Sequence, residues 1–151
     1  MKDHLAQASM LIRRPAAEVF DAFVNPETIT KFWLESTTGP LQKGAQVRWH
    51  FMVPGATETV TVTAFESPKR IAFDWSDGNS VNLVFEARGD AATRLAVEAS
   101  GLQDESEAVN ATEGFSIVLC DLKTLLESGR SANLVRDKAE LIAASQAGQS
   151  N

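Results

Sequence analysis

Between residues 47 and 99 the sequence repeats one pattern five times: a short segment in which apolar and polar side chains alternate. Alternation with a period of two is typical of a β-strand that buries one face. Turn residues such as Pro54-Gly55 and Asp77-Gly78 separate the segments, and turns this short join antiparallel strands. The chain must therefore form one antiparallel sheet. The five expected strands are residues 47–53, 57–65, 70–76, 80–88 and 93–99.

Helical patterns stand on both sides of these strands. Residues 5–12 alternate like a further strand, residues 15–24 carry apolar side chains at helical spacing, and Pro26 opens a second short helix. A long helix follows the last strand and ends at Gly129. We therefore predict an α+β fold with an antiparallel sheet of about six strands, two short helices after the first strand and a long C-terminal helix. The apolar face of that helix consists of Phe115, Val118, Leu119, Leu122, Leu125 and Leu126.

The length fits one domain, and the composition excludes several classes of protein. We expect a single domain over residues 1–146 and a frayed polar tail over residues 147–151. The net charge of −6 has the wrong sign for nucleic acid, and no apolar run approaches the ~20 residues of a membrane span. The first ten residues lack the layout of a secretory signal, so we expect a cytoplasmic protein. His4, His50 and Cys120 form no metal-binding set, and we expect no metal and no cofactor.

Two segments carry a recognisable combination of residues. The first reads IRRPAAEVFDAF over residues 12–23, with Asn25-Pro26 and Phe32-Trp33 after it, and the second carries Gly114-Phe115, Leu119, Leu122, Lys123, Leu126, Glu127 and Gly129. Over about residues 5–129 the chain resembles the heat-shock-protein-90 ATPase activator homologue family of the START-like (SRPBCC, helix-grip) superfamily. The resemblance implies a helix-grip fold, in which the curved antiparallel sheet wraps around the long C-terminal helix. It also implies a cavity between sheet and helix that in many relatives holds an apolar or aromatic molecule. Phe115 departs from the family, which usually has tryptophan there.

The inward positions of the expected strands and long helix are candidates for lining such a cavity. Pockets are mostly apolar, but the same residue types also fill an ordinary core, so both interpretations stay open. Each of the three indole N–H groups needs an acceptor, which could be a ligand, a trapped water or a backbone carbonyl. The candidate residues are Trp33, Trp49, Phe51, Val62, Phe73, Trp75, Leu83, Phe85, Leu95, Val97, Phe115 and Leu119.

The long helix has two further features that call for a partner. Gly114 costs about 1 kcal/mol relative to alanine inside a helix, so close approach of the sheet or of a ligand should require its small size. Ile117 and Cys120 lie on the side opposite Phe115, where a helix facing solvent should be polar. Either residues 134–142 or a second copy of the chain, in a homodimer, could cover them.

No catalytic residues are predicted. The sequence lacks a Gly-x-Ser-x-Gly motif, a phosphate-binding loop and zinc spacing. By alternation His50 and Asp74 face outward, and Glu58 could reach the mouth of the cavity, although a surface glutamate is the simpler interpretation.

Three functions stay open. The first is the binding of a small apolar or aromatic molecule, and the second is a chaperone-associated role in the stress response, as the family name suggests. The eukaryotic activators carry a separate N-terminal chaperone-binding region, whereas this chain begins within a few residues of its first strand. The third is a cyclase-like or hydrolase-like enzyme, for which Glu58 is the one candidate.

Overall fold

The computed structural model describes residues 4–149 of the chain. Its elements follow one another in an α+β order, with two short helices after the first strand and two longer helices after the last. They are β1 (His4–Ile12), α1 (Ala16–Val24), α2 (Pro26–Phe32), β2 (Leu34–Thr37), β3 (Gln46–Phe51), β4 (Thr57–Glu66), β5 (Arg70–Trp75), β6 (Ser80–Ala87), β7 (Thr93–Leu102), α3 (Glu105–Ser128) and α4 (Leu134–Gln149).

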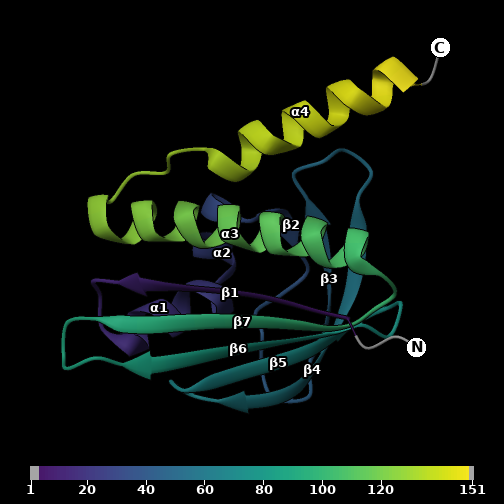
Figure 1. The fold of residues 1–151 in the computed structure, drawn as a ribbon. Coiled ribbons are helices and arrows are strands. Elements are labelled where there is room, and N and C mark those ends of the chain that lie inside the picture. The colour runs from purple at the N-terminus through teal and green to yellow at the C-terminus, as the bar shows by residue number, and fades with distance from the viewer. Residues whose placement is uncertain (1–3, 150–151) are drawn as a thin grey trace.

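The strands form one antiparallel sheet in the order β1-β7-β6-β5-β4-β3-β2, and α3 lies across one face of it (Figure 1). This arrangement confirms the predicted α+β, helix-grip class. The described strands number seven rather than about six, because β2 pairs with β3 after α2. β3 also ends at Phe51, so Met52 and Val53 lie outside the strand that we predicted to reach residue 53.

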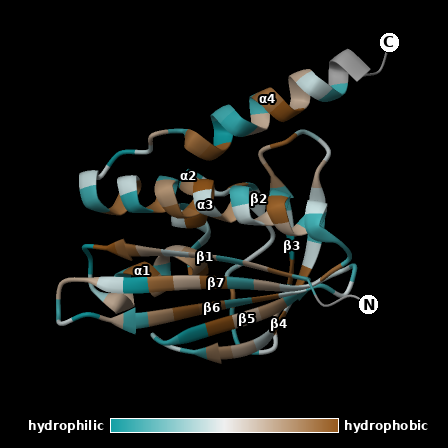
Figure 2. Ribbon diagram, in the orientation of Figure 1, coloured by the Kyte–Doolittle hydropathy of each residue, from teal (hydrophilic) through white to brown (hydrophobic). Residues whose placement is uncertain are grey.

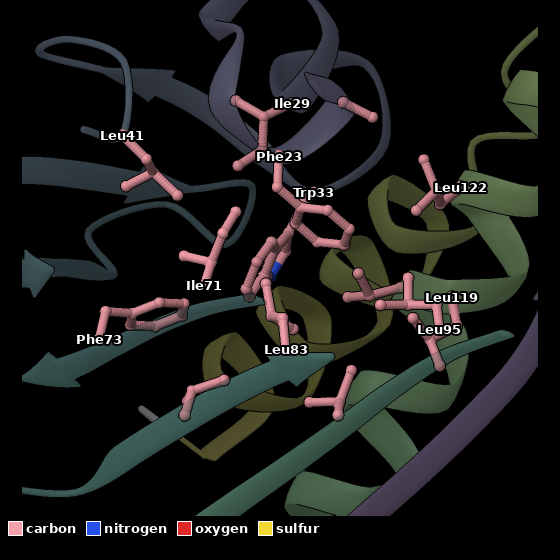
Figure 3. Close-up of a cluster of buried hydrophobic side chains, with 14 of the residues drawn as sticks. Phe23, Ile29, Trp33, Leu41, Ile71, Phe73, Leu83, Leu95, Leu119 and Leu122 are labelled. Atoms are coloured by element: carbon pink, nitrogen blue, oxygen red, sulfur yellow. The ribbon is translucent and has the colours of Figure 1, made fainter. Parts of the chain in front are cut away.

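The core lies between the sheet and the helices α1, α2 and α3. Figure 3 shows Phe23, Trp33 and Leu119 pointing toward one another from different elements. Edge-to-face contacts connect the aromatic rings of this core, with ring centroids 6.0 Å apart for Phe23 and Trp33 and 4.9 Å apart for Trp33 and Trp49. This geometry is the one that aromatic pairs prefer.

Polar contacts join the C-terminal end of α3 to the end of β1, and they explain part of the second family segment. The Nζ atom of Lys123 donates to the backbone oxygen of Leu11 at 2.7 Å and lies 2.6 Å from Oε2 of Glu127. That same Oε2 accepts a hydrogen bond from the backbone N–H of Arg13 at 2.8 Å. The Arg13 N–H and then Lys123 lower the pKa of the Glu127 carboxyl group.

The last helix, α4, lies on the side of α3 that faces away from the sheet, and its far end diverges from the body (Figure 1). Figure 2 shows apolar residues at its start and near its middle. Segment 134–142 therefore covers the far side of α3, as one of our two alternatives had it, and Ile117 and Cys120 are partly buried. α4 runs to Gln149 and so includes the first three residues of the expected tail, while residues 150–151 lie outside the described part.

No helix within residues 4–149 has the length and apolarity to cross a membrane.

Candidate functional site

A pocket of about 320 Å³ lies where α3, α4 and the turn between β3 and β4 meet. β3 leaves the sheet at Phe51, and the chain turns through Met52 and Val53 before β4 begins. In Figure 1 this turn rises beside α3 toward α4. The lining residues are Trp33, Phe51, Met52, Val53, Ala56, Trp75, Ala111, Gly114, Phe115, Ile117, Val118, Val135, Lys138, Ala139 and Ile142.

Four of the twelve residues expected at a cavity line this pocket: Trp33, Phe51, Trp75 and Phe115. The other eight are buried among one another, at 4% exposure or less, in the core between the sheet and α3. These eight are Trp49, Val62, Phe73, Leu83, Phe85, Leu95, Val97 and Leu119. Sequence reasoning missed the contributions of the β3–β4 turn and of α4, although it had offered residues 134–142 as one of two possible covers for the far side of α3.

The aromatic residues form one connected wall along the pocket. The ring centroids of Trp33 and Phe115 lie 5.9 Å apart, and those of Phe51 and Trp75 also lie 5.9 Å apart. Trp49, which lies in the core, contacts both pairs: its ring centroid lies 4.9 Å from that of Trp33 and 5.8 Å from that of Trp75. A flat apolar molecule can therefore contact several rings at once.

The indole N–H groups of the three tryptophans have no acceptor in the described part of the chain. Within residues 4–149, the N–H groups of Trp33, Trp49 and Trp75 donate no hydrogen bond to another described residue. Of the three acceptors considered from the sequence, the backbone carbonyl is therefore absent from the described part of the chain. A ligand or a water molecule is the remaining acceptor.

Gly114 opens space in the pocket wall. Among the described residues, a Cβ atom built on Gly114 meets nothing within 4 Å, apart from the neighbouring backbone of its own helix. Packing against the sheet, which was one of the two reasons expected for this glycine, therefore does not require it. Because Gly114 lines the pocket, a side chain there would extend into the space that a ligand can occupy.

α4 forms the outer wall of the pocket and is fixed to the body at three places. The Oδ2 atom of Asp121 in α3 accepts a hydrogen bond from the backbone N–H of Val135 at 3.1 Å. Nζ of Lys138 lies 2.7 Å from Oε1 of Glu113. A third contact joins Arg136 to Glu35 of β2 at 2.9 Å, so α4 bridges α3 and the edge of the sheet.

Asp121 is a fully buried carboxylate that caps α4 from outside the helix. Burial raises the pKa of its carboxyl group, against the opposing effect of backbone N–H groups of Val135, Ala132 and Leu134. Its Oδ1 atom has no hydrogen-bond partner in the described part of the chain. The N-terminus of α4 supplies donors and a favourable dipole, which together accommodate the buried acid.

The polar candidates from the sequence lie elsewhere. Glu58 accepts a hydrogen bond from the hydroxyl of Ser76 at 2.6 Å and does not line the pocket. His50 lies opposite Thr57 in the ladder between β3 and β4, and it too is absent from the lining. Within residues 4–149 no three His, Cys, Asp or Glu side chains come together as a metal-binding group. Lys138 is the one charged side chain among the residues that line the pocket.

The comparison with protein families gives one match. The model of the family described as Activator of Hsp90 ATPase homolog 1-like protein matches residues 13–127. This range runs from the turn after β1 to the end of α3, so α4 lies beyond it. No curated protein matches the chain.

Several solved structures share the fold. Protein SSP2350 from Staphylococcus saprophyticus is 25% identical, with a TM-score of 0.76 over 85% of this chain and 95% of that one. The Aha1 dimer from Colwellia psychrerythraea is 15% identical, with a TM-score of 0.77 over 85% and 99% of the two chains. DynU16, a putative protein in the dynemicin biosynthetic locus, is 23% identical, with a TM-score of 0.77 over 85% of this chain and 49% of that chain. This chain therefore spans about half the length of DynU16.

Proposed function

Since the chain belongs to the family of Activator of Hsp90 ATPase homolog 1-like proteins, we propose that its pocket under α4 binds a small apolar or aromatic molecule. One observation carries this proposal: aromatic rings in mutual contact line the pocket, and the pocket wall is open at Gly114. Gly114 is itself exposed, so the space beside it is open to an incoming molecule.

The size and chemistry of the pocket suit such a ligand. Binding pockets range from about 300 to 1,000 Å³ and are mostly apolar with few polar groups, which this pocket matches. A dry apolar cavity of about 150 Å³ accommodates benzene, so about 320 Å³ suits a molecule of roughly two rings. The unpaired indole N–H groups of Trp33 and Trp75 would favour a ligand that carries an acceptor atom.

Native mass spectrometry of the protein purified from its host is expected to show an adduct of a few hundred daltons. The adduct should disappear on denaturation, because it is held by the fold and not by a covalent bond. The same spectrum reports whether the chain forms a homodimer, which stays a prediction. A bare mass from gently purified protein, together with no binding of two-ring aromatic probes, would contradict the proposal.

Substitution of Gly114 separates ligand binding from stability. Gly114→Ala is expected to raise the free energy of unfolding by about 1 kcal/mol, because alanine is the better helix former and its Cβ meets no other atom. Gly114→Leu should fill the pocket and weaken binding of the neutral probe 2-naphthamide about tenfold or more, measured by quenching of tryptophan fluorescence. Glu105→Leu is the control on the opposite side of the same helix, nine residues before Gly114, and it should leave the affinity unchanged. Equal affinity in Gly114→Leu and the control would place the probe elsewhere.

The two other functions have less support in the pocket. The lining residues include no acid–base pair, and Glu58 is bound to Ser76 outside the pocket, so Lys138 is the one titratable side chain among them. Association with a chaperone rests on the family name alone, and a pull-down against Hsp90 with a measurement of its ATPase rate would test it.

A further inference from the structure

We propose that the ligand carries one negative charge at the edge of its apolar body, and that Lys138 of α4 selects this charge. The inference rests on the proposed function, since it assigns the chemical class of the molecule in the same pocket. The expected class is an aromatic or apolar carboxylate or sulfonate of about two rings.

Lys138 is placed where its ammonium group can bind a charged group at the edge of the pocket. Its side chain is 38% exposed, so its stem lies against the apolar lining and its ammonium group reaches water. The other lining residues are apolar side chains and one glycine. A ligand that covers this lysine must therefore either supply an anion or leave the ammonium group with less water and no new partner.

The present partner of Lys138 can be replaced. Oε1 of Glu113 lies 2.7 Å from the ammonium nitrogen, but Glu113 is 57% exposed and does not line the pocket. Exposed pairs of this kind contribute little to stability, so Glu113 can turn into water when a ligand carboxylate takes its place. The ligand anion would be held partly out of water, where a charge-assisted hydrogen bond is stronger.

Competing charges near the site do not favour a cation. The protein carries a net charge of −6, but no acidic side chain is among the lining residues. A cationic ligand in the pocket would face Lys138 directly and could reach Glu113 only outside the pocket. The order of affinity expected for ligands of equal shape is therefore anion, then neutral molecule, then cation.

A pair of isosteric probes tests the proposal on the full-length chain. Wild-type protein should bind 2-naphthoate about tenfold more tightly than neutral 2-naphthamide, a ratio typical of one charge-assisted hydrogen bond. In Lys138→Met the ratio should fall to about one, and in Glu113→Gln, which frees the lysine, it should rise severalfold. Lys43→Met removes an equal charge from an exposed position away from the pocket and should keep the ratio near ten.

The outcomes distinguish a failure of the role of Lys138 from a failure of the pocket as a binding site. If the amide and the naphthoate bind equally well, or if Lys43→Met lowers the ratio as much as Lys138→Met, the assignment of Lys138 is wrong while the pocket stands. If neither probe binds, the proposed function itself fails and the inference with it. Melting curves of each variant check that its fold is retained.

Discussion

Deleting residues 131–151 is expected to weaken binding of the neutral probe 2-naphthamide by roughly fiftyfold while the sheet and α3 remain folded. Val135, Ala139 and Ile142 of α4 form one wall of the pocket. Covering roughly 100 Å² of apolar ligand surface at about 25 cal/mol per Å² stabilises the complex by about 2.5 kcal/mol. The body should survive because the family match ends at residue 127, before α4 begins.

A matched pair of point variants tests the same wall without truncation. Ile142 lines the pocket, whereas its neighbour Leu141 is 68% exposed and lies outside the lining. Ile142→Ala should therefore weaken binding severalfold, and Leu141→Ala should not. Circular dichroism checks the fold of each protein, and fluorescence titration measures the affinity. Tight binding by the truncated chain would show that the molecule lies deeper, between the sheet and α3.

The strands could be predicted from the sequence because their side-chain alternation is a local property. Ranges such as 80–88 and 93–99 match β6 and β7 to within one to three residues. β2 escaped prediction because its four residues include a single buried side chain, Leu34, which shows no period. It is a strand only because β3 lies beside it.

The pocket could be predicted only in part, because alternation tells which side of a strand faces inward and not how deep the residue lies. Trp49 and Phe73 face inward and are closed over by the core, whereas Phe51 and Trp75 face the same way at the end of the sheet. What separates the two pairs is the position of α4, which depends on tertiary contacts. Gly114 was the local signal for open space, and its meaning became clear only from its surroundings.

Replacing Asp121 with alanine is expected to lower the free energy of unfolding by about 1–3 kcal/mol at neutral pH. The change leaves backbone N–H groups at the start of α4, including that of Val135, without their acceptor. It should also loosen α4 and so weaken ligand binding. Urea unfolding measures the first effect and fluorescence titration the second. Thr124→Ala in the same helix is the control and should change stability less, because its hydroxyl donates to the backbone oxygen of Cys120 within α3 and not to α4.

The pH dependence distinguishes the buried acid from an ordinary hydrogen-bonding group. Because burial raises the pKa of Asp121 above its ordinary 3.8, the folded protein binds this proton more tightly than the unfolded chain does. The resulting stabilisation is complete below the ordinary value and is lost as pH rises through the raised one. Wild-type protein should therefore lose stability relative to Asp121→Asn as the pH rises from about 3.5 to 7. Glu127, whose pKa is lowered, contributes equally to both proteins and cancels in the difference. A difference that stays constant over this range would mean that Asp121 is hydrated, and that α4 does not cover it.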